Sequence, residues 1–515
     1  MRRKYGSVIV MTLGFSFALA LNAFTLWGVS DLLSPDSAWP WAASDFRAIC
    51  LPINVLTFFA YGLLAMWVPR ISLRRPVMPA CFALLLGAVF LVLGCIEVIP
   101  GPTLFRVSGG LFGAGGALAF VCWEQSFARY GIPMACQSIL AASLLAVVPY
   151  LGLVFLARDV MVYPLACLLV PTCVLLLILS RVLDSKPAGA PVDDAASRFA
   201  KTGEGMTSTS HHVVGTSYSG PSDWRRFLAD AGAPLACVMM IGVVGPAVGS
   251  FASLGGMSDS LRAVLYQLAS IAAIATLAVL WFRLRVRPTI TGAFLVLVPV
   301  LAVAIFLFPF WSNGYQGFFL ALGCYVFSLV SILMMVFCIE LSECHDMSIS
   351  VIYGLFAGGT YAAQVLGGAL ADVVASSSFP RQFQVVAVAA LLVWGLSAIA
   401  LVLMRRGANG LGRETSEPAV PVHMTTEVFA SDPLSARCEE LGSLYGLSPR
   451  ELQVLELIGR GRDVGAIAEM LCLSRNTVRS HVSRLYSDLG VHNRQELIDL
   501  IDQSSNGRRT ESNKP

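Results

Sequence analysis

The chain has 515 residues, of which 56% are hydrophobic and only 13% are charged. Its mean hydropathy of +0.72 lies well outside the range of soluble globular proteins, which carry roughly a quarter charged residues. A soluble protein is therefore excluded, and most of the chain is expected in a lipid bilayer. The net charge of +3 indicates neither a nucleic-acid partner nor an acidic substrate. Only the local distribution of charged residues can indicate such a partner.

Thirteen cysteines are scattered through apolar stretches without a CxxC pair or nearby histidines. This pattern predicts buried, reduced thiols, and we expect no disulfide framework, metal site or other cofactor. The basic N-terminus and the apolar run at 7–28 have the look of a signal peptide, but the run is too long for one and further spans follow. It is interpreted as a first transmembrane helix.

Apolar runs of about 20 residues, which cross a bilayer as helices, recur throughout the first 404 residues. They form two groups of six, so the expected fold class is all-α, with a polytopic membrane helix bundle of about 12 transmembrane helices followed by a C-terminal domain. The spans are expected at 7–30, 48–68, 77–97, 103–125, 133–156, 160–181, 234–254, 262–282, 288–310, 317–339, 348–370 and 383–404.

Orientation follows from Lys and Arg, which are hard to translocate. Basic residues precede the first span and follow spans two, four, six, eight and twelve, all on one side. Both termini are therefore expected in the cytoplasm and the chain in the inner membrane. Isolated exceptions near span ends are Arg47, Arg106, Arg158, Arg262 and Arg381.

Residues 184–233 separate the first six spans (1–183) from the second six (234–406). This stretch is rich in Ser, Gly, Thr and Ala, and is predicted to form a disordered cytoplasmic linker. His211 and His212 within it could bind a metal, but adjacent histidines in such a linker are expected to be solvated.

Six spans, a long loop and six more spans resemble the major facilitator superfamily. In that family, the motif after the second span carries an Asp where this chain has Met66. The resemblance implies that this acid takes part in charge contacts that latch one conformation. Its absence here argues against alternating-access transport.

Polar side chains within the spans are candidates for binding a mostly apolar small molecule. Alternatively, each of them hydrogen-bonds between helices. Arg106 and Glu124 lie near opposite ends of the fourth span, where an interfacial position competes with a cavity-lining one. Glycines cluster at 109–116 and 354–368, where spacings of four predict close helix packing, with a substrate role or a dimerisation face as the alternatives. The candidate ligand-sensing residues are Asn22, Asn54, Arg106, Gln137, Gln267 and Gln364.

After Arg406 the composition changes. Residues 407–432 are predicted to be a flexible tether, 433–503 a helical domain with an amphipathic lead-in and four helices, and 504–515 a disordered tail. The third helix is expected to begin at Ser474 and to end at Gly490. Asn493 with Glu496 opens the fourth helix. The inner stripe of the third helix is Val478, Val482, Leu485 and Leu489.

A short second helix, a tight turn and a capped third helix indicate a helix-turn-helix, which presents its third helix to the major groove of DNA. The outer face of this third helix is rich in arginine and serine and carries no acid before Asp488. Arginine can donate two hydrogen bonds to guanine, while groups near the helix start hold phosphates. The predicted DNA-binding residues are Ser474, Arg475, Asn476, Thr477, Arg479, Ser480, His481, Ser483 and Arg484.

Roughly the last 65 residues closely resemble the LuxR-type helix-turn-helix. The resemblance implies that Arg479, Ser480 and Ser483 face bases and that Thr477 and Arg475 touch phosphates. The matching residues are Leu447, Ser448, Arg450, Glu451, Val454, Leu455, Gly461, Ile467, Ala468, Leu471, Ser474, Thr477, Val478, Arg479, His481, Leu489, Gly490, Val491, Asn493 and Arg494.

Two further positions bear on the resemblance. His481 would either pack at the helix flank or touch a phosphate. Val464 and Gly465 stand where the family usually has a lysine pair, which weakens backbone affinity and indicates binding as a homodimer, or with help from crowding at the membrane.

Together these features predict a one-component regulator, in which the membrane domain senses a small-molecule effector and the tethered domain binds promoter DNA. One alternative is a major-facilitator-like transporter with a regulatory C-terminal domain, and another is a helix-turn-helix that docks a protein. No Ser, His and Asp group as nucleophile and base, so an enzyme is not expected.

Overall fold

The computed structural model describes residues 2–27, 42–67, 76–99, 102–156, 158–185, 220–253, 259–284, 286, 288–307, 315–345, 347–376, 381–411, 433–445 and, with gaps, 447–503. The chain divides into two compact units, Met1–Ala419 and Val420–Pro515. The described parts of both units are built from helices without any strand, which confirms the expected all-α class.

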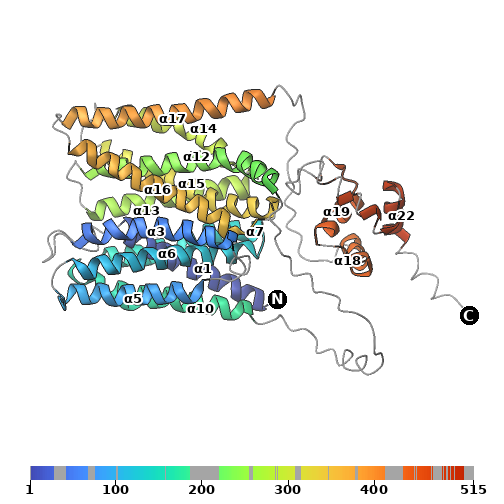
Figure 1. Cartoon of the computed structure of the whole chain (residues 1–515), viewed down its shortest axis with the longest axis horizontal. Coiled ribbons are helices and arrows are strands. Elements are labelled where there is room, and N and C mark those ends of the chain that lie inside the picture. Colours follow the sequence, from blue (N-terminus) through green and yellow to red (C-terminus); the bar gives the residue numbers. More distant parts are fainter. Residues whose placement is uncertain are drawn as a thin grey trace, which may run out of the picture. The chain divides into compact units, whose positions relative to one another are not determined.

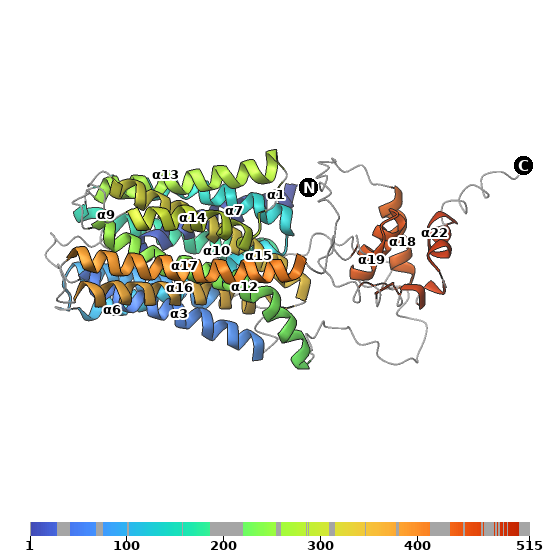
Figure 2. The same ribbon diagram turned by 90° about the horizontal axis from the view of Figure 1, so that it is seen from above.

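The first unit, here called the membrane unit, has a first half of α1 (Arg2–Asn22), η1 (Ala23–Trp27), α3 (Ala42–Trp67), α5 (Val77–Cys95), α6 (Thr103–Ala128), α7 (Ile132–Leu145), α8 (Val147–Val154), α9 (Arg158–Pro164), η2 (Leu165–Leu169) and α10 (Val170–Ser185). Its second half comprises α12 (Gly220–Ser253), α13 (Asp259–Ala278), η3 (Val279–Arg283), α14 (Ile290–Leu307), α15 (Tyr315–His345), α16 (Ile349–Ala375) and α17 (Arg381–Leu411). The helices run alongside one another, and α1 begins at the end of the bundle where α17 finishes (Figures 1 and 2).

Eleven helices within the described ranges are long and apolar enough to cross a membrane, in agreement with eleven of the expected spans. The span expected at 234–254 falls in α12, whose described apolar stretch is Asp230–Val244. This helix begins at Gly220, before the predicted end of the linker at 233. Phe227 in its early part is fully buried and packs on the His345 ring of α15, with ring centroids 5.8 Å apart. The helix therefore continues past the apolar core of the span, while His211 and His212 lie outside the described residues.

Glycines of α6 allow it to approach α3 closely. A Cβ at Gly109 or Gly113 would overlap the carbonyl oxygens of Phe46 and Cys50. Since lipid supplies no hydrophobic force between helices, dispersion from such close backbone contact holds the bundle together. The predicted packing role of the first glycine cluster is confirmed.

The two halves meet along α3 and α16. A Cβ at Gly354 would lie 2.8 Å from the Phe58 carbonyl oxygen and 3.2 Å from the Cα atom of Gly62. The Phe58 ring also stacks on Tyr361 of α16, with centroids 5.7 Å apart. Close contact at these points joins the halves into one membrane unit.

The second unit, called the C-terminal domain, contains α18 (Pro433–Tyr445), α19 (Pro449–Gly459) and α22 (Arg494–Gln503). Its core is separate from that of the membrane unit, so the domain has its own source of hydrophobic stability. The buried residues of this core are Cys438, Leu441, Val454, Leu455, Ile458, Ile467, Val478, Leu485, Leu489, Val491, Leu497 and Ile501.

We predict that Gly113→Ala destabilises the membrane unit by about 1–3 kcal/mol, because the added methyl group meets a backbone carbonyl that cannot move independently. Gly116→Ala on the same helix is the matched control, since its Cβ would lie 3.9 Å from the nearest atom outside its own helix, Asn54 Nδ2. Thermal unfolding of the purified chain in detergent measures the difference. Equal melting temperatures for the two variants would contradict the close-contact account.

Candidate nucleic-acid interface and membrane site

The C-terminal domain buries the stripe predicted for its third helix. Val478 and Leu485 are fully buried, Leu489 is buried, and Val482 packs against the same core while remaining partly exposed. Residues recurring at this spacing on one helical face leave the opposite face outside the core. The prediction of an inner stripe is confirmed.

Most of the predicted DNA-contacting residues fall outside the described residues. These are Ser474, Arg475, Asn476, Thr477, Arg479, Ser480, Ser483 and Arg484, and their contacts with DNA stay predictions. His481 is described and is half-buried, at the border between the core and the surface.

Two glycines end helical segments of this domain with left-handed backbone. Gly490 has a φ of +66°, and the next N–H, from Val491, donates to the Tyr486 carbonyl at 2.9 Å. Gly461 has a φ of +81°, and the N–H of Arg462 donates to the Leu457 carbonyl at 3.0 Å. This pattern satisfies carbonyl groups that a helix end leaves unpaired. The predicted stop at Gly490 is confirmed.

The last helix starts with a reciprocal cap. The Glu496 N–H donates to Asn493 Oδ1 at 2.9 Å, and Asn493 Nδ2 donates to Glu496 Oε1 at 2.6 Å. Arg494 then donates to the Arg462 carbonyl at 2.9 Å, which fixes the start of α22 against the turn after α19. The opening of the fourth helix at Asn493 is confirmed.

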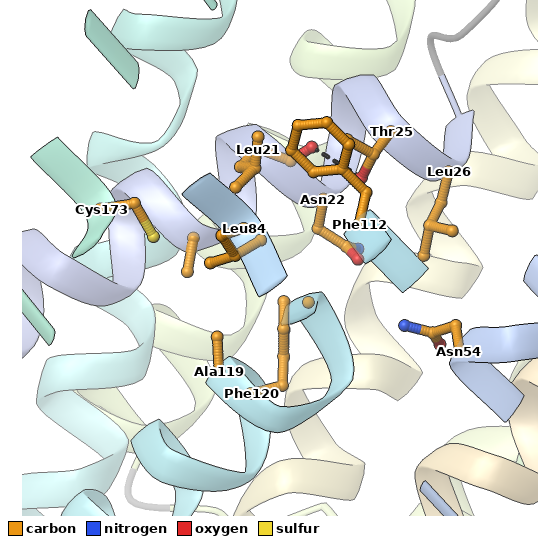
Figure 3. Close-up of a pocket in the computed structure, with 12 residues that line it drawn as sticks. Leu21, Asn22, Thr25, Leu26, Asn54, Leu84, Phe112, Ala119, Phe120 and Cys173 are labelled. Atoms are coloured by element: carbon orange, nitrogen blue, oxygen red, sulfur yellow. Dashed lines mark hydrogen bonds between the residues drawn. The ribbon is translucent and has the colours of Figure 1, made fainter. Parts of the chain in front are cut away.

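In the membrane unit, Asn22 of α1 and Asn54 of α3 border one small cavity (Figure 3). Asn22 donates to the Tyr361 hydroxyl of α16 at 3.3 Å, and Asn54 donates to the Gly113 carbonyl at 3.0 Å. The Oδ1 atom of Asn54 is buried without a hydrogen-bond partner among the described groups. The cavity volume of about 10 Å³ fits one water molecule rather than an organic ligand.

The other candidate ligand-sensing residues do not border this cavity. Arg106 is largely exposed and forms an ion pair with Asp45 of α3 at 2.7 Å. Gln137 is exposed and Gln267 is half-buried. Gln364 of α16 is buried, and its Nε2 atom has no hydrogen-bond partner in the part of the chain described. The structure thus brings together Asn22 and Asn54 only.

The sequence allowed two positions for Glu124, one at the membrane interface and one lining a cavity. Its side chain is fully buried, and neither carboxyl oxygen has a hydrogen-bond partner among the described residues. Phe120 and Phe127, one helical turn to either side on the same face, are also buried. That apolar helical face was the signal in the sequence that favours the inner position over an interfacial one.

Comparison with known proteins identifies the C-terminal domain. The family described as "Bacterial regulatory proteins, luxR family" matches residues 446–501. The uncharacterized response regulatory protein YgeK of Escherichia coli K12 is 34% identical over 104 residues, which are 19% of this chain and 71% of that protein. Through this domain, the chain belongs to the LuxR family of bacterial regulators.

The membrane unit has a fold like that of a solved membrane transporter. A bacterial homologue of the iron transporter ferroportin, solved in an outward-facing state, matches with a TM-score of 0.51 and 14% identity, covering 79% of this chain and 100% of that one. The major facilitator superfamily transporter FucP in its outward conformation matches with a TM-score of 0.48 and 13% identity, covering 78% and 99%. At 14% identity, the ferroportin homologue shows a likeness of fold alone.

We predict that Asn493→Ala lowers the free energy of unfolding of a 433–515 fragment by about 1 kcal/mol, because the first N–H groups of α22 lose their cap. Asn493→Asp keeps an acceptor oxygen and most of the stability. Gln495→Ala is the control, since that exposed side chain bonds only to Asp499 one turn along the helix and costs a few tenths of a kcal/mol. Urea unfolding measures all three, and an equal loss for both alanine variants would rule out the cap.

Proposed function

We propose that the chain is a membrane-anchored transcription regulator. Its C-terminal domain binds promoter DNA, and its membrane unit senses a small-molecule effector. The observation that carries this proposal is the presence, in one chain, of a LuxR-family match at 446–501 and a helical membrane unit ending at Ala419. The role is one of binding and regulation rather than catalysis.

DNA lies in the cytoplasm, so the proposal requires the C-terminal domain on that side of the inner membrane. The start of α1 and the end of α17 lie at the same end of the bundle (Figure 1). This arrangement supports a cytoplasmic position of both termini. Arg479, Ser480 and Ser483 are proposed to face bases, with Arg475 and Thr477 on phosphates. The remaining predicted contacts are Ser474, Asn476, His481 and Arg484.

Binding as a homodimer fits the missing lysine pair, because two half-sites compensate for weak contacts to one. Two membrane-anchored copies also meet at a higher effective concentration than free domains do. An effector that shifts the pairing of the membrane units would then change occupancy of the promoter.

The effector is proposed to bind a second arrangement of the membrane unit. The cavity beside Asn22 and Asn54 is water-sized in the arrangement described, whereas organic ligands occupy roughly 300–1,000 Å³. The hydrogen bond from Asn22 to Tyr361 joins the two halves at this cavity. Breaking it would enlarge the space between α1 and α16, and Asn22, Asn54 and Gln364 would supply polar contacts.

Transport with a regulatory C-terminal domain is the second candidate function. The fold likeness to a ferroportin homologue over all of that protein's length favours it. Uptake of a labelled effector into cells that express the chain distinguishes the two functions. A regulator binds the effector without accumulating it, and a transporter accumulates it.

We predict that the 433–515 fragment binds DNA from the promoter region of its target genes in a gel-shift experiment. Arg479→Ala should weaken this binding about 5- to 100-fold, which is the loss expected when one arginine no longer contacts a base. Arg460→Ala is the matched control, because that arginine is exposed and pairs with Glu456 of its own helix. Equal binding by the two variants would remove the proposed recognition face.

We further predict that a promoter reporter responds to the effector only with the full chain. The fragment alone should give a constant output, because it lacks the membrane unit. Reporter activity with and without effector measures this. An unchanged effector response from the fragment would place sensing outside the membrane unit.

A further inference from the structure

Glu124 of α6 is the only Asp, Glu, Lys or Arg whose side chain is buried in the described part of the chain. Its exposed fraction is 0%, and neither carboxyl oxygen has a hydrogen-bond partner there. An ionised carboxylate in such surroundings loses its hydration without compensation, which costs far more than the burial of a neutral acid. Packing alone therefore does not explain a carboxyl group at this position.

The position of Glu124 is at the contact between the two halves. Tyr353 of α16 and Cys338 of α15 both interact electrostatically with its carboxyl group. The next residue, Gln125, donates to the Ser350 hydroxyl of α16 at 2.7 Å. Glu124 of the first half therefore lies where α6 meets α16 of the second half.

Among possible ligands of Glu124, a proton fits its surroundings best. No group of three or more His, Cys, Asp or Glu that could hold a metal occurs in the described ranges. Neither carboxyl oxygen is hydrogen-bonded to a Lys, Arg or His within those ranges. A metal or organic cation would lack both ligands and room, whereas a proton requires neither.

We propose that Glu124 is a proton-binding site that couples the two halves of the membrane unit. The carboxylic acid keeps its proton while α6 packs against α15 and α16. When the halves separate, water enters, the O–H bond breaks and the proton passes to water. A rise in pH therefore shifts the membrane unit toward the separated arrangement, and a fall in pH shifts it toward the closed one.

Every element packed against α6 bears on this proposal. From α16 and α15 the groups that interact with Glu124 are Tyr353 and Cys338. From α3, Tyr61 interacts with the neighbouring Gln125 and with Cys122. All three are neutral hydrogen-bonding groups. In the described ranges η1, α5 and α7 carry no Asp, Glu, Lys, Arg or His, and the basic residues of α1 all stand at positions 2–4. The carboxyl group is therefore the one that changes charge at this contact. The inference does not depend on DNA binding.

Hydrogen exchange of the full chain in lipid nanodiscs tests the proposal, with readouts in peptides covering 119–128 and 349–358. Wild type and Glu124→Gln are compared at each pH from about 5 to about 9, the range in which buried carboxyl groups titrate, so that the intrinsic exchange chemistry cancels. Glutamine keeps the shape of the neutral acid and cannot ionise. Glu343→Gln on α15 is the matched control, because Glu343 is exposed.

We expect similar exchange at the acidic end. At the alkaline end we expect exchange at least about tenfold faster in the wild type than in Glu124→Gln, because one titrating proton shifts an equilibrium by up to about tenfold for each pH unit. Glu343→Gln should follow the wild type. Identical exchange of wild type and Glu124→Gln at every pH overturns the proposal. If Glu124→Gln does not insert, the wild type decides: exchange that follows only the intrinsic pH effect, measured on the unfolded chain, overturns it too.

Discussion

Large apolar side chains cover the outside of the membrane unit, where a soluble protein would carry charge. Leu56, Phe82, Val296 and Trp394 are each more than half exposed. Lipid is the solvent that accepts such a surface, and it leaves backbone N–H and C=O groups to pair within helices. A domain that binds DNA can then share this chain only if it folds around its own core in water, as the C-terminal domain does.

In the proposed regulator, communication between the two units begins within the membrane unit, where its halves meet. Gly62 and Gly354 bring α3 and α16 close together, and Asn22 reaches Tyr361 across the same contact. Helices in such close backbone contact slide or separate as bodies rather than deform gradually. In this proposal, an effector or a proton acts on the contact between the halves by favouring one of two arrangements.

Local signals predicted local structure well. The cap at Asn493, the stop at Gly490 and the stripe through Val478 and Leu485 depend on neighbours along the chain, and sequence reads these directly. Twelve apolar runs predicted the membrane unit for the same reason. Positions that depend on tertiary packing were harder to predict, because hydropathy does not indicate which helices pack together. Composition did not predict the early start of α12, which depends on a helix distant in the sequence. For Glu124, only the apolar residues on the same helical face favoured burial, and its partners on other helices could not be predicted.

In the proposed regulator, one polypeptide is held in a bilayer while its C-terminal domain binds specific DNA. Flotation of inner-membrane vesicles tests it directly, with the cytoplasmic face turned outward and a labelled promoter fragment in solution. The account predicts that vesicles containing the full chain carry the promoter fragment to the top of the gradient, and that those with Arg479→Ala do not. Promoter DNA that stays at the bottom with the wild-type vesicles, or that floats equally with a scrambled sequence, would contradict it.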